Sequence, residues 1–522
     1  MSHLVHDILF DSARATPDAP ALEYGAQRCS YADLAAQVGA AANALLETGV
    51  GAGERVAVYM EKRIENVVAM LGASAAGAVF VPVNPLLKAE QVRYILADCN
   101  VRVLVTTAER YKGLAAVLPA LPDLRTVLVT NGDDLPAPAI DWHSALAGAP
   151  QATAQRRIDA DMAAILYTSG STGAPKGVVL SHRNLVAGAH SVAQYLELSS
   201  RDSILSVLPL SFDYGLSQLT TAFLRGARVV LMNYLFARDI PAAVSQHGIT
   251  VLAAVPPLWN QLARLPWPAD STLRVLTNSG GAMPRPTVEA LVAALPRAQL
   301  FLMYGLTEAF RSTYLPPAQL ASRPDSIGRA IPNAEIMVVR PDGTPCAPGE
   351  EGELVHRGAL VALGYWNDAA RTAERFRPAP GQDPALPLLE VAVWSGDTVR
   401  RDAEGFLYFV GGSDEMIKVS GYRISPTEIE EVLYATGMVL EAAAFGIADP
   451  QLGQAVVVVV LAPEGGAVTA AGLIKECQRR LPAYMVPSQV IVADTSLPRN
   501  PNGKIDRSLL RRTLLENESR TS

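Results

Sequence analysis

Short apolar runs alternate with longer amphipathic stretches along most of the chain. Residues 55–59, 101–106 and 126–130 are each a short, mainly apolar run rich in β-branched side chains, which is typical of buried strands. Residues 64–76, between two such runs, carry a helical pattern. Alternation of helices with short apolar strands predicts a doubly wound α/β architecture.

The C-terminal part of the chain continues with helices and strands in a different arrangement. Residues 426–435 and 469–480 have helical patterns, and residues 456–461 form a strongly β-branched strand between them. Residues 136–150 are rich in Ala and Pro, so they are predicted to form a surface loop. We find no fixed-period repeat and no low-complexity tract.

One polar stretch stands out from this pattern. Residues 167–177 read YTSGSTGAPKG and lie between the apolar runs 162–166 and 178–180, which predicts a strand, a polar loop and a second strand. Glycines let backbone N–H groups turn inward, so that hydroxyls and the Lys176 ammonium can surround a polyanion. The P-loop requires a helix after its Gly-Lys pair, whereas Lys176 precedes a glycine and a strand. The alternative, a solvated linker, is disfavoured because linkers rarely join two strands.

Three further stretches carry groups that suit a nucleotide. Residues 301–308, FLMYGLTE, are an apolar run that ends in an aromatic ring, a hydroxyl and a carboxylate. The carboxylate of Glu308 is a hard oxygen ligand of the kind that Mg²⁺ prefers. Residues 393–397, VWSGD, end in another carboxylate, and residues 497–504, LPRNPNGK, form a proline-restricted turn that presents a lysine.

The ordered set of motifs resembles the adenylate-forming (AMP-binding) superfamily of acyl-CoA synthetases, peptide-synthetase adenylation domains and luciferases. Matches extend from about Ser30 to Lys504, so the resemblance covers most of the chain. It implies a large N-terminal adenylation domain, 1–411, built of doubly wound sheets with a β-rich subdomain. It also implies a hinge at 412–414, centred on Asp414, and a small mobile α+β domain, 415–522.

The resemblance also implies the residues that bind ATP and Mg²⁺. Tyr304 offers its ring to adenine, Asp397 accepts hydrogen bonds from both ribose hydroxyls, and Glu308 binds Mg²⁺. The expected catalytic residues are Lys504, Glu308 and Thr307, with Lys504 neutralising charge as the pentacovalent phosphorus forms. The remaining nucleotide contacts are expected from Thr168, Ser169, Gly170, Ser171, Thr172, Gly173, Lys176, Gly281 and Ala282.

The chain departs from its superfamily at position 412. The usual pattern there is Gly-Arg-x-Asp, whereas residues 411–414 read GGSD. The missing arginine normally contacts the nucleotide. Either the affinity for ATP is reduced or another cation, such as Arg423, takes its place.

The pattern of the acid-binding pocket resembles that of enzymes that activate amino acids. Acyl-CoA synthetases tend to carry an aromatic-His pair where this chain has Ser211-Phe212-Asp213. In the amino-acid branch this aspartate pairs with the substrate's ammonium, while Ser279 and Arg311 fall at pocket positions. A buried guanidinium requires an anion, so Arg311 suggests a second carboxylate on the substrate. Three alternatives remain: Asp213 is a helix N-cap, Ser279 caps a turn, or Asp213 and Arg311 pair with each other.

The resemblance implies the following chemistry. The carboxylate of an acidic or β-type amino acid attacks the α-phosphorus of Mg-ATP and pyrophosphate leaves. The small domain then rotates, and a phosphopantetheine thiol takes the acyl group. We expect the thiol to belong to a separate acyl or peptidyl carrier protein, with coenzyme A as the alternative. The competing hypotheses are an acyl-CoA synthetase for a non-amino acid and a non-catalytic nucleotide-binding homologue, which only Gly412 favours.

Composition agrees with a large globular enzyme. Of the 522 residues, 49% are hydrophobic and 18% are charged, and the net charge of −7 argues against nucleic acid or an anionic membrane as partner. Four scattered Cys without CxxC spacing favour free thiols, and the seven His show no metal-ligand spacing. No apolar run approaches the 18 residues of a membrane span, and residues 1–20 carry Asp and Arg where a signal peptide would be apolar. We therefore expect a cytoplasmic protein.

Overall fold

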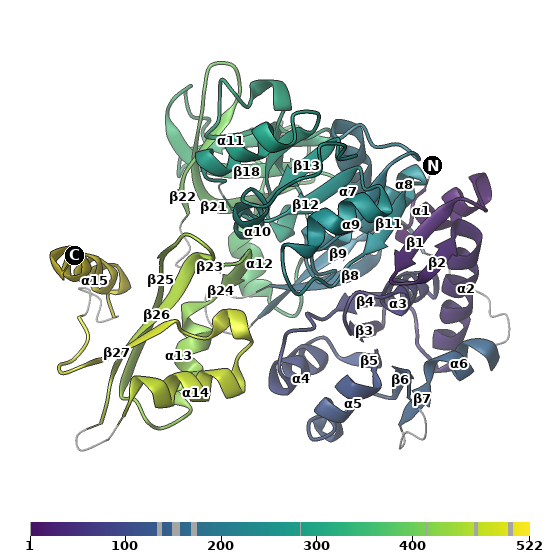
Figure 1. Ribbon diagram of the computed structural model, residues 1–522, viewed down its shortest axis with the longest axis horizontal. Coiled ribbons are helices and arrows are strands. Elements are labelled where there is room, and N and C mark those ends of the chain that lie inside the picture. Colours follow the sequence, from purple (N-terminus) through teal and green to yellow (C-terminus); the bar gives the residue numbers. More distant parts are fainter. Residues whose placement is uncertain are drawn as a thin grey trace.

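A computed structural model describes residues 2–132, 138–148, 157–168, 175–281, 283–412, 416–463, 468–498 and 505–521. It is a mixed α/β structure with a large N-terminal part and a small C-terminal part, as predicted (Figure 1). Within the described residues the strands form three sheets. The large sheets belong to the N-terminal part, and the smallest sheet belongs to the C-terminal part.

The first sheet has eight strands in the order β19-β9-β8-β4-β3-β5-β6-β7. Its strands from β4 to β7 run parallel, whereas β8 and β9 form an antiparallel hairpin around the expected phosphate loop. The bounds are β3 (Arg55–Tyr59), β4 (Val79–Pro82), β5 (Val101–Thr107), β6 (Thr126–Thr130), β7 (Ala139–Asp141), β8 (Met162–Thr168), β9 (Lys176–Ser181) and β19 (Gly364–Tyr365).

The second sheet has 14 strands and joins a parallel half to a β-rich antiparallel half. Its parallel half consists of β1 (Pro20–Tyr24), β10 (Ser203–Ser206), β11 (Arg228–Leu231), β12 (Val251–Ala254), β13 (Val275–Asn278) and β14 (Gln299–Tyr304). The antiparallel strands are β2 (Gln27–Ser30), β15 (Thr313–Leu315), β16 (Ser326–Ala330), β17 (Ala334–Val339), β18 (Glu351–Gly358), β20 (Phe376–Pro378), β21 (Val391–Arg401) and β22 (Leu407–Gly412).

Helices cover both sheets of the N-terminal part and share its main core. Among them, α3 is buried along its whole length, which explains why its pattern is apolar on every side. The bounds are α1 (Val5–Ala15), α2 (Tyr31–Glu47), α3 (Ile64–Ala75), α4 (Ala89–Asp98), α5 (Ala108–Leu114), α6 (Trp142–Gly148), α7 (His182–Tyr195), α8 (Asp213–Arg225), α9 (Asp239–His247), α10 (Pro256–Leu262), α11 (Arg285–Ala294) and α12 (Ala369–Arg375), with 3₁₀ turns at Leu118–Ala120, Thr307–Ala309 and Pro317–Gln319.

The prediction of a surface loop over residues 136–150 is wrong for the part that the structure describes. Residues 139–141 form β7, which pairs in parallel with β6, and residues 142–148 form α6. Trp142 is only 2% exposed and belongs to the main core. The Ala- and Pro-rich composition conceals this one large apolar anchor, whose burial stabilises a short edge strand and helix.

The C-terminal part has a sheet and a core of its own. Its strands are β23 (Ile417–Val419), β24 (Tyr422–Ile424), β25 (Glu441–Asp449), β26 (Gly453–Leu461) and β27 (Gln489–Ala493). Its helices are α13 (Pro426–Tyr434), α14 (Ala470–Arg480) and α15 (Arg507–Thr521), with a 3₁₀ turn at Ala483–Met485. A separate apolar cluster fills the space between α13, α14 and the sheet. An independent core of this kind suits a part that moves as a unit.

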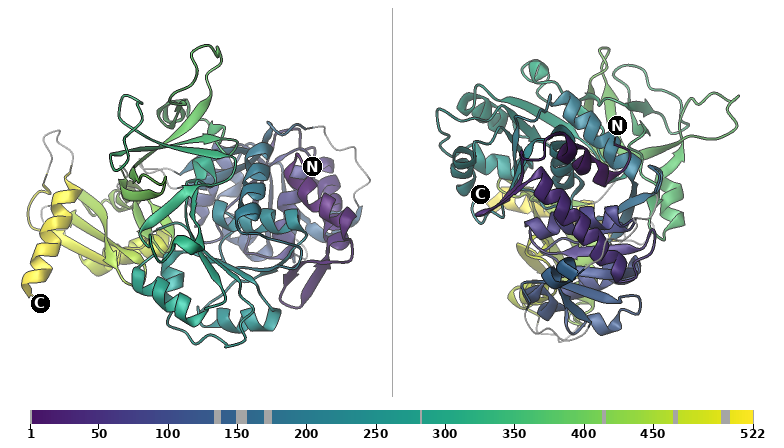
Figure 2. Two further views of the ribbon diagram at one scale, coloured as in Figure 1. Left: turned by 90° about the horizontal axis from the view of Figure 1, so that it is seen from above. Right: turned by 90° about the vertical axis from the view of Figure 1, so that its right-hand side faces the viewer.

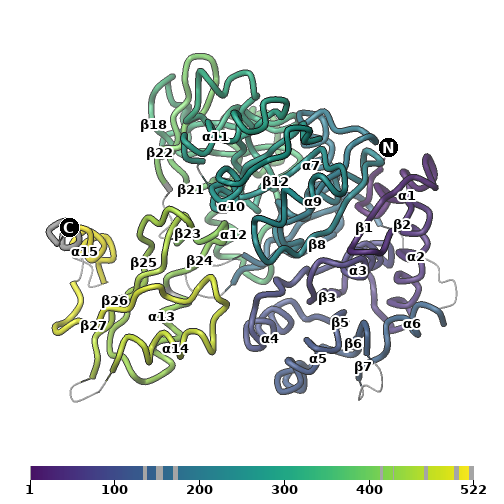
Figure 3. The backbone as a smooth tube through the Cα atoms, viewed as in Figure 1, coloured from purple at the N-terminus to yellow at the C-terminus, as the bar shows by residue number. Residues whose placement is uncertain are grey.

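The C-terminal part packs against the N-terminal part on the side that carries α4 and α10 (Figures 1 and 2). Gln91 on α4 donates a 3.0 Å hydrogen bond to Glu428 on α13. The ring of Phe212 meets Tyr422 edge-on, and Tyr422 in turn stacks on Tyr484 at 3.8 Å. Asp414, the expected hinge residue, lies outside the described residues. The two chain ends lie at opposite sides of the molecule (Figure 3).

Two further expectations concern the whole chain. Cys29, Cys99, Cys346 and Cys477 are all buried free thiols, as the scattered spacing predicts. Among the helices that the structure describes, none combines the length and apolar character that a membrane span requires.

Candidate functional site

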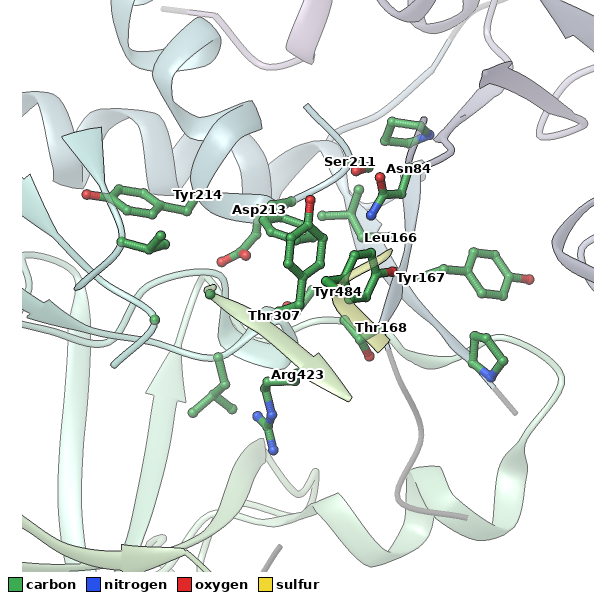
Figure 4. A pocket seen from close by; sticks show the side chains of 18 of the residues that line it. Asn84, Leu166, Tyr167, Thr168, Ser211, Asp213, Tyr214, Thr307, Arg423 and Tyr484 are labelled. Carbon is green, nitrogen blue, oxygen red and sulfur yellow. The ribbon is translucent and has the colours of Figure 1, made fainter. Parts of the chain in front are cut away.

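A cavity of about 180 Å³ lies where the two parts of the molecule meet. It is lined by the end of β8, the start of α8, the residues after β13 and β14, and β24 with α13 of the C-terminal part. Figure 4 shows Thr168, Asp213, Thr307 and Arg423 around it. Residues far apart in the sequence converge here because parallel strands of both sheets end at this edge.

The first group in this region is a buried ion pair. Lys176 Nζ lies 3.0 Å from Glu308 Oε1 and 2.8 Å from the hydroxyl of Tyr365, which itself donates a 2.7 Å hydrogen bond to the same Oε1. Burial opposes ionisation of Glu308, but the charge of Lys176 and the bond from Tyr365 outweigh it and lower the pKa of Glu308 to about 2. Glu308 is therefore a carboxylate at any physiological pH.

The second group is a set of unused polar atoms at the phosphate-loop end. Thr168 ends β8 and its buried hydroxyl has no hydrogen-bond partner among the described residues. Thr307 opens the 3₁₀ turn after β14 and also lines the cavity. A buried hydroxyl without a partner is costly, so Thr168 is suited to a ligand oxygen. The hydroxyls and Lys176 fit a polyphosphate.

The fit to Mg²⁺ rests on Glu308. Among the described residues, both hydrogen bonds to its carboxylate use Oε1, which leaves Oε2 for a cation. Mg²⁺ in phosphate sites is held by one or two carboxylates together with substrate oxygens. Within the described residues no group of three or more His, Cys, Asp and Glu forms a protein-only metal site. The residues present thus fit Mg²⁺ only in company with a phosphate.

The third group pairs the expected ribose and adenine residues. The Tyr304 hydroxyl, at the end of β14, donates a 2.5 Å hydrogen bond to Asp397 Oδ2 on β21. Burial and the charge of Asp397 raise the pKa of Tyr304 well above its usual value. Asp397 lies directly opposite Gly412 in the β21–β22 ladder, which places the departure from the superfamily beside the expected ribose residue.

Arg423 of the C-terminal part supplies a positive charge at this site. It lines the cavity from β24, and its charge helps to lower the pKa of Glu308 and opposes the rise in the pKa of Tyr304. Arg423 therefore lies near both the expected magnesium residue and the expected adenine residue. The cation that could substitute for the missing arginine is thus present near the site.

Asp213 and Arg311 form the opposite end of the cavity. Arg311 Nη1 lies 2.6 Å from Asp213 Oδ2 and donates a second, 2.7 Å bond to the carbonyl of Phe310. The guanidinium lies over the ring of Tyr214 at 4.7 Å. The two side chains pair with each other, which is one of the alternatives that the sequence left open.

Each partner of this pair keeps an unused atom. The Arg311 side chain is 3% exposed, and its Nη2 is buried without a hydrogen-bond partner among the described residues. Asp213 is 17% exposed and spends only Oδ2 on the pair. The N-cap of α8 is Phe212, and no side chain caps the helix, so Asp213 does not act as an N-cap. One oxygen of Asp213 and one nitrogen of Arg311 therefore remain available to a ligand.

A strained turn sets the direction of Arg311. Phe310, between Glu308 and Arg311, has φ of 56° although it is not glycine, and its ring is fully buried. The ring fits because position 188 on α7 is glycine: a Cβ there would lie 2.5 Å from it. Positive φ in a non-glycine residue costs energy and is found where surrounding packing imposes it. This packing orients Glu308 and Arg311.

The remaining predicted residues divide into two sets. Ser279 is buried and lines the cavity next to Gly280, whereas Gly281 is not among the lining residues; its carbonyl accepts a bond from Asn278. Outside the described residues lie Ser169, Gly170, Ser171, Thr172, Gly173, Ala282 and Lys504.

Sequence patterns missed Tyr365, Tyr214 and Tyr484. Tyr365 reaches Glu308 because β19 pairs with β9. Tyr365 lies 189 residues after Lys176, the first residue of β9. No local spacing reveals such a contact. Tyr214 follows Asp213 directly in the sequence. An aromatic residue next to a predicted pocket carboxylate was the signal that could have identified Tyr214.

Comparison with known proteins agrees with this geometry. The model of the AMP-binding enzyme family matches residues 9–366, and that of the AMP-binding enzyme C-terminal domain matches residues 428–504. An L-proline--[L-prolyl-carrier protein] ligase of Pseudomonas fluorescens is 32% identical over 98% of this chain and 99% of its own length. A feruloyl-CoA synthase of an Amycolatopsis species is 31% identical over 96% and 97%. The structure of a double mutant of o-succinylbenzoate CoA synthetase from Bacillus subtilis is similar with a TM-score of 0.84 and 27% identity, covering 96% of this chain and 97% of that one.

Proposed function

The chain belongs to the AMP-binding enzyme family of adenylate-forming ligases, and from that premise we propose that it activates an acidic or β-type amino acid. The acid is joined to AMP from ATP, and the acyl group then passes to the phosphopantetheine thiol of a carrier protein. One observation carries this proposal: a single cavity has the hydroxyl groups of Thr168 and Thr307 at one end and the Asp213–Arg311 pair at the other.

At the phosphate end, the residues act by charge and position. Lys176 and the hydroxyls of Thr168 and Thr307 bind phosphate oxygens, and Glu308 offers Oε2 to Mg²⁺. When bound, Mg²⁺ neutralises negative charge on the phosphates. Asp397 binds the ribose, and Lys504 bridges the attacking carboxylate and the α-phosphate. None of these residues forms a covalent bond with substrate, so positioning and electrostatics provide the catalysis.

At the acid-binding end, the substrate supplies hydrogen-bond partners for the atoms of Asp213 and Arg311 that have none within the described part of the protein. An ammonium group binds the free oxygen of Asp213, and a second carboxylate binds the free Nη2 of Arg311. A buried guanidinium with an unsatisfied N–H favours an anion strongly. Aspartate and its methylated or homologous relatives carry both groups at suitable separation, in addition to the carboxylate that reacts.

The acceptor is proposed to be a carrier protein. The proline ligase that resembles this chain over nearly its full length is named for a carrier-protein acceptor. Asp213 belongs to the pattern of amino-acid-activating enzymes, which supports the same choice. Coenzyme A carries the same phosphopantetheine thiol, so both acceptors fit the chemistry.

Pyrophosphate release in the presence of ATP, Mg²⁺ and a panel of acids tests this function. Aspartate, a methylated aspartate or glutamate should release pyrophosphate, whereas hexanoate and benzoate should not. Thioester formation is then compared between carrier protein and coenzyme A. Failure of every acid in the panel would leave a nucleotide-binding protein without ligase activity.

A second function is favoured by one observation. Because Asp213 and Arg311 already pair with each other, this end of the cavity carries no uncompensated charge from the pair and can also hold a non-amino acid. The similarity to a feruloyl-CoA synthase supports this alternative, an AMP-forming acyl-CoA synthetase. A preference for aromatic or fatty acids with coenzyme A would establish it.

A further inference from the structure

A second cavity of about 320 Å³ adjoins the first. Six residues line both cavities, namely Pro82, Asn84, Ser211, Phe212, Val255 and Tyr422. Ser211 and Phe212 immediately precede Asp213, so the shared wall lies beside the acid-binding end. The C-terminal part closes one side of the second cavity with Ser420 and Tyr422.

The second cavity also reaches the protein surface. Leu86 and Tyr234 line it and are 51% and 37% exposed. A reactant that enters past these side chains can approach the shared wall without passing the phosphate-binding end of the first cavity. The second cavity therefore offers a separate route to the acyl group.

Lys62 lines this cavity and has no role in the function proposed above. The side chain of Asn233 holds its backbone from both sides, accepting from its N–H at 3.2 Å and donating to its carbonyl at 2.7 Å. Its Nζ donates a 3.0 Å bond to the carbonyl of Val207, which also lines the cavity. Lys62 is 8% exposed, and no carboxylate in the described part of the chain lies within ion-pair distance of its Nζ.

The other ionisable groups of the cavity do not neutralise Lys62. Glu61 is engaged by Arg110, whose guanidinium also donates a 2.7 Å bond to the carbonyl of Pro85. The remaining two are the phenols of Tyr234 and Tyr422, whose pKa values burial raises. Burial of a cation without an anion is costly, and it lowers the pKa of Lys62 to about 8.

We propose that Lys62 is the base of the thiol-transfer step: its neutral amine accepts the proton of a phosphopantetheine thiol that enters through the second cavity. This proposal rests on the proposed function, because it requires an acyl-adenylate in the first cavity. A lysine that is partly neutral near physiological pH has the proton affinity that general base catalysis requires.

The step balances as follows. The S–H bond breaks while the Lys62 amine gains the proton, which leaves a thiolate beside an ammonium. The thiolate sulfur bonds to the acyl carbonyl carbon, and the bond from that carbon to the AMP phosphate oxygen breaks. AMP leaves with the electron pair, and the Lys62 ammonium returns its proton to solvent.

Two substitutions separate a base from a fixed charge. Lys62→Met removes both charge and base, and Lys62→Arg keeps the charge but cannot be deprotonated. In single turnovers with aspartate, ATP and pantetheine, both variants should form thioester about 10²-fold more slowly or worse. Pyrophosphate release, in which Lys62 takes no part, shows that each variant is folded. Lys112→Met, at an exposed lysine on α5, is the matched control and should leave both steps unchanged. A Lys62→Arg variant with the wild-type thioester rate would overturn the proposal.

The acidity of the thiol provides a second readout that a structural role would not change. With an aryl thiol that is already ionised at the assay pH, no base is required, so the Lys62→Met defect should shrink to less than about tenfold. In the wild type, the rate with pantetheine should rise as pH passes about 8. An equal defect with both thiols would assign Lys62 to packing and reject the base.

The two proposals fail differently. If no acid in the panel releases pyrophosphate, the proposed function is wrong, whichever residue is altered. The ultraviolet thiolate absorbance of pantetheine bound to wild type and to Lys62→Met then tests Lys62 without any acid. Thiolate near pH 7.5 in the wild type alone supports the base, and equal spectra reject it.

Discussion

At the scale of single residues, we propose that Asp213 and Arg311 decide which acid the protein can accept. Their mutual 2.6 Å contact keeps both charges satisfied before a substrate arrives, which a lone buried charge would not be. Because the two charges already pair, each discriminates less between charged and neutral substrates than it would alone. Substrate choice therefore depends on the atoms that the pair leaves over, Asp213 Oδ1 and Arg311 Nη2.

Arg311→Leu should weaken transition-state binding of aspartate by about 2–5 kcal/mol, because it leaves the substrate carboxylate and Asp213 unpaired. The kcat/KM for pyrophosphate release with aspartate, compared with that for alanine, measures the loss. Asp213→Asn should fail with every amino acid but retain a simple dicarboxylic acid such as succinate. Leu87→Ala, at an apolar position of the same cavity, is the control for general damage to the pocket. Equal losses with aspartate and alanine would contradict the role given to Arg311.

Lys504→Ala should slow adenylation by about 10²- to 10³-fold or more, since one transition-state charge contact contributes about 3–4 kcal/mol. Thioester formation from pre-made acyl-adenylate should largely survive, because no phosphorus centre changes in that step. Rapid-quench measurement of each half-reaction separates the two effects. If both half-reactions slow equally, Lys504 has a different role.

At the scale of elements, the sequence predicted what depends on local periodicity and missed what depends on long-range pairing. The strands at residues 55–59 and 126–130 agree with the structure to the residue, because each is a complete apolar run. The strand β7 and helix α6 were hidden by their Ala- and Pro-rich setting. Motif resemblance singled out Glu308 and Asp397, but not Tyr365, whose contact with Glu308 depends on β19 pairing with β9.

The Asp213–Arg311 contact marks a second limit. The two residues come from the first turn of α8 and the turn after β14, 98 residues apart. Their separation depends on the strand order of the second sheet and on the strained backbone of Phe310. Residue types predicted both charges, but only packing decides whether the charges face each other.

The pairing of β21 with β22 allows a test of position 412, where this chain has glycine and the superfamily pattern has arginine. Gly412 lies opposite Asp397, so a side chain there would share its face of the sheet. Gly412→Arg should lower the KM for ATP by about tenfold or more, as a charged hydrogen bond contributes roughly 1.5–3 kcal/mol. Gly411→Arg, which points to the other face, is the control. An unchanged KM would mean that Arg423 already supplies this contact.

At the scale of the whole molecule, a buried carboxyl group links the two parts. Glu428 on α13 accepts the bond from Gln91 on α4, and burial raises the pKa of Glu428 to about 7, although that bond opposes the shift. When the parts separate, water restores its ordinary pKa of 4.5. The docked arrangement is thus fully favoured below pH 4.5 and loses this stabilisation as pH rises through about 7.

Glu428→Gln should make docking independent of pH in this range, since an amide donates and accepts without ionising. The distance distribution between labels on the two parts, measured at pH 6 and pH 8, should shift in the wild type and stay constant in the variant. Asp494→Asn, at an exposed position of the C-terminal part, is the control and should behave like the wild type. A wild-type distribution unaffected by pH would contradict the role of Glu428.

The central claim is that one cavity joins the carboxylate of a doubly charged amino acid to AMP. The most direct measurement compares kcat/KM for pyrophosphate release with aspartate, succinate and alanine. Succinate lacks only the ammonium, and alanine replaces the second carboxylate with hydrogen. With either analogue, Asp213 Oδ1 or Arg311 Nη2 stays without a hydrogen-bond partner, so each value should fall by about 10⁴-fold. Equal values for aspartate and either analogue, or a higher value for ferulate, would contradict the claim.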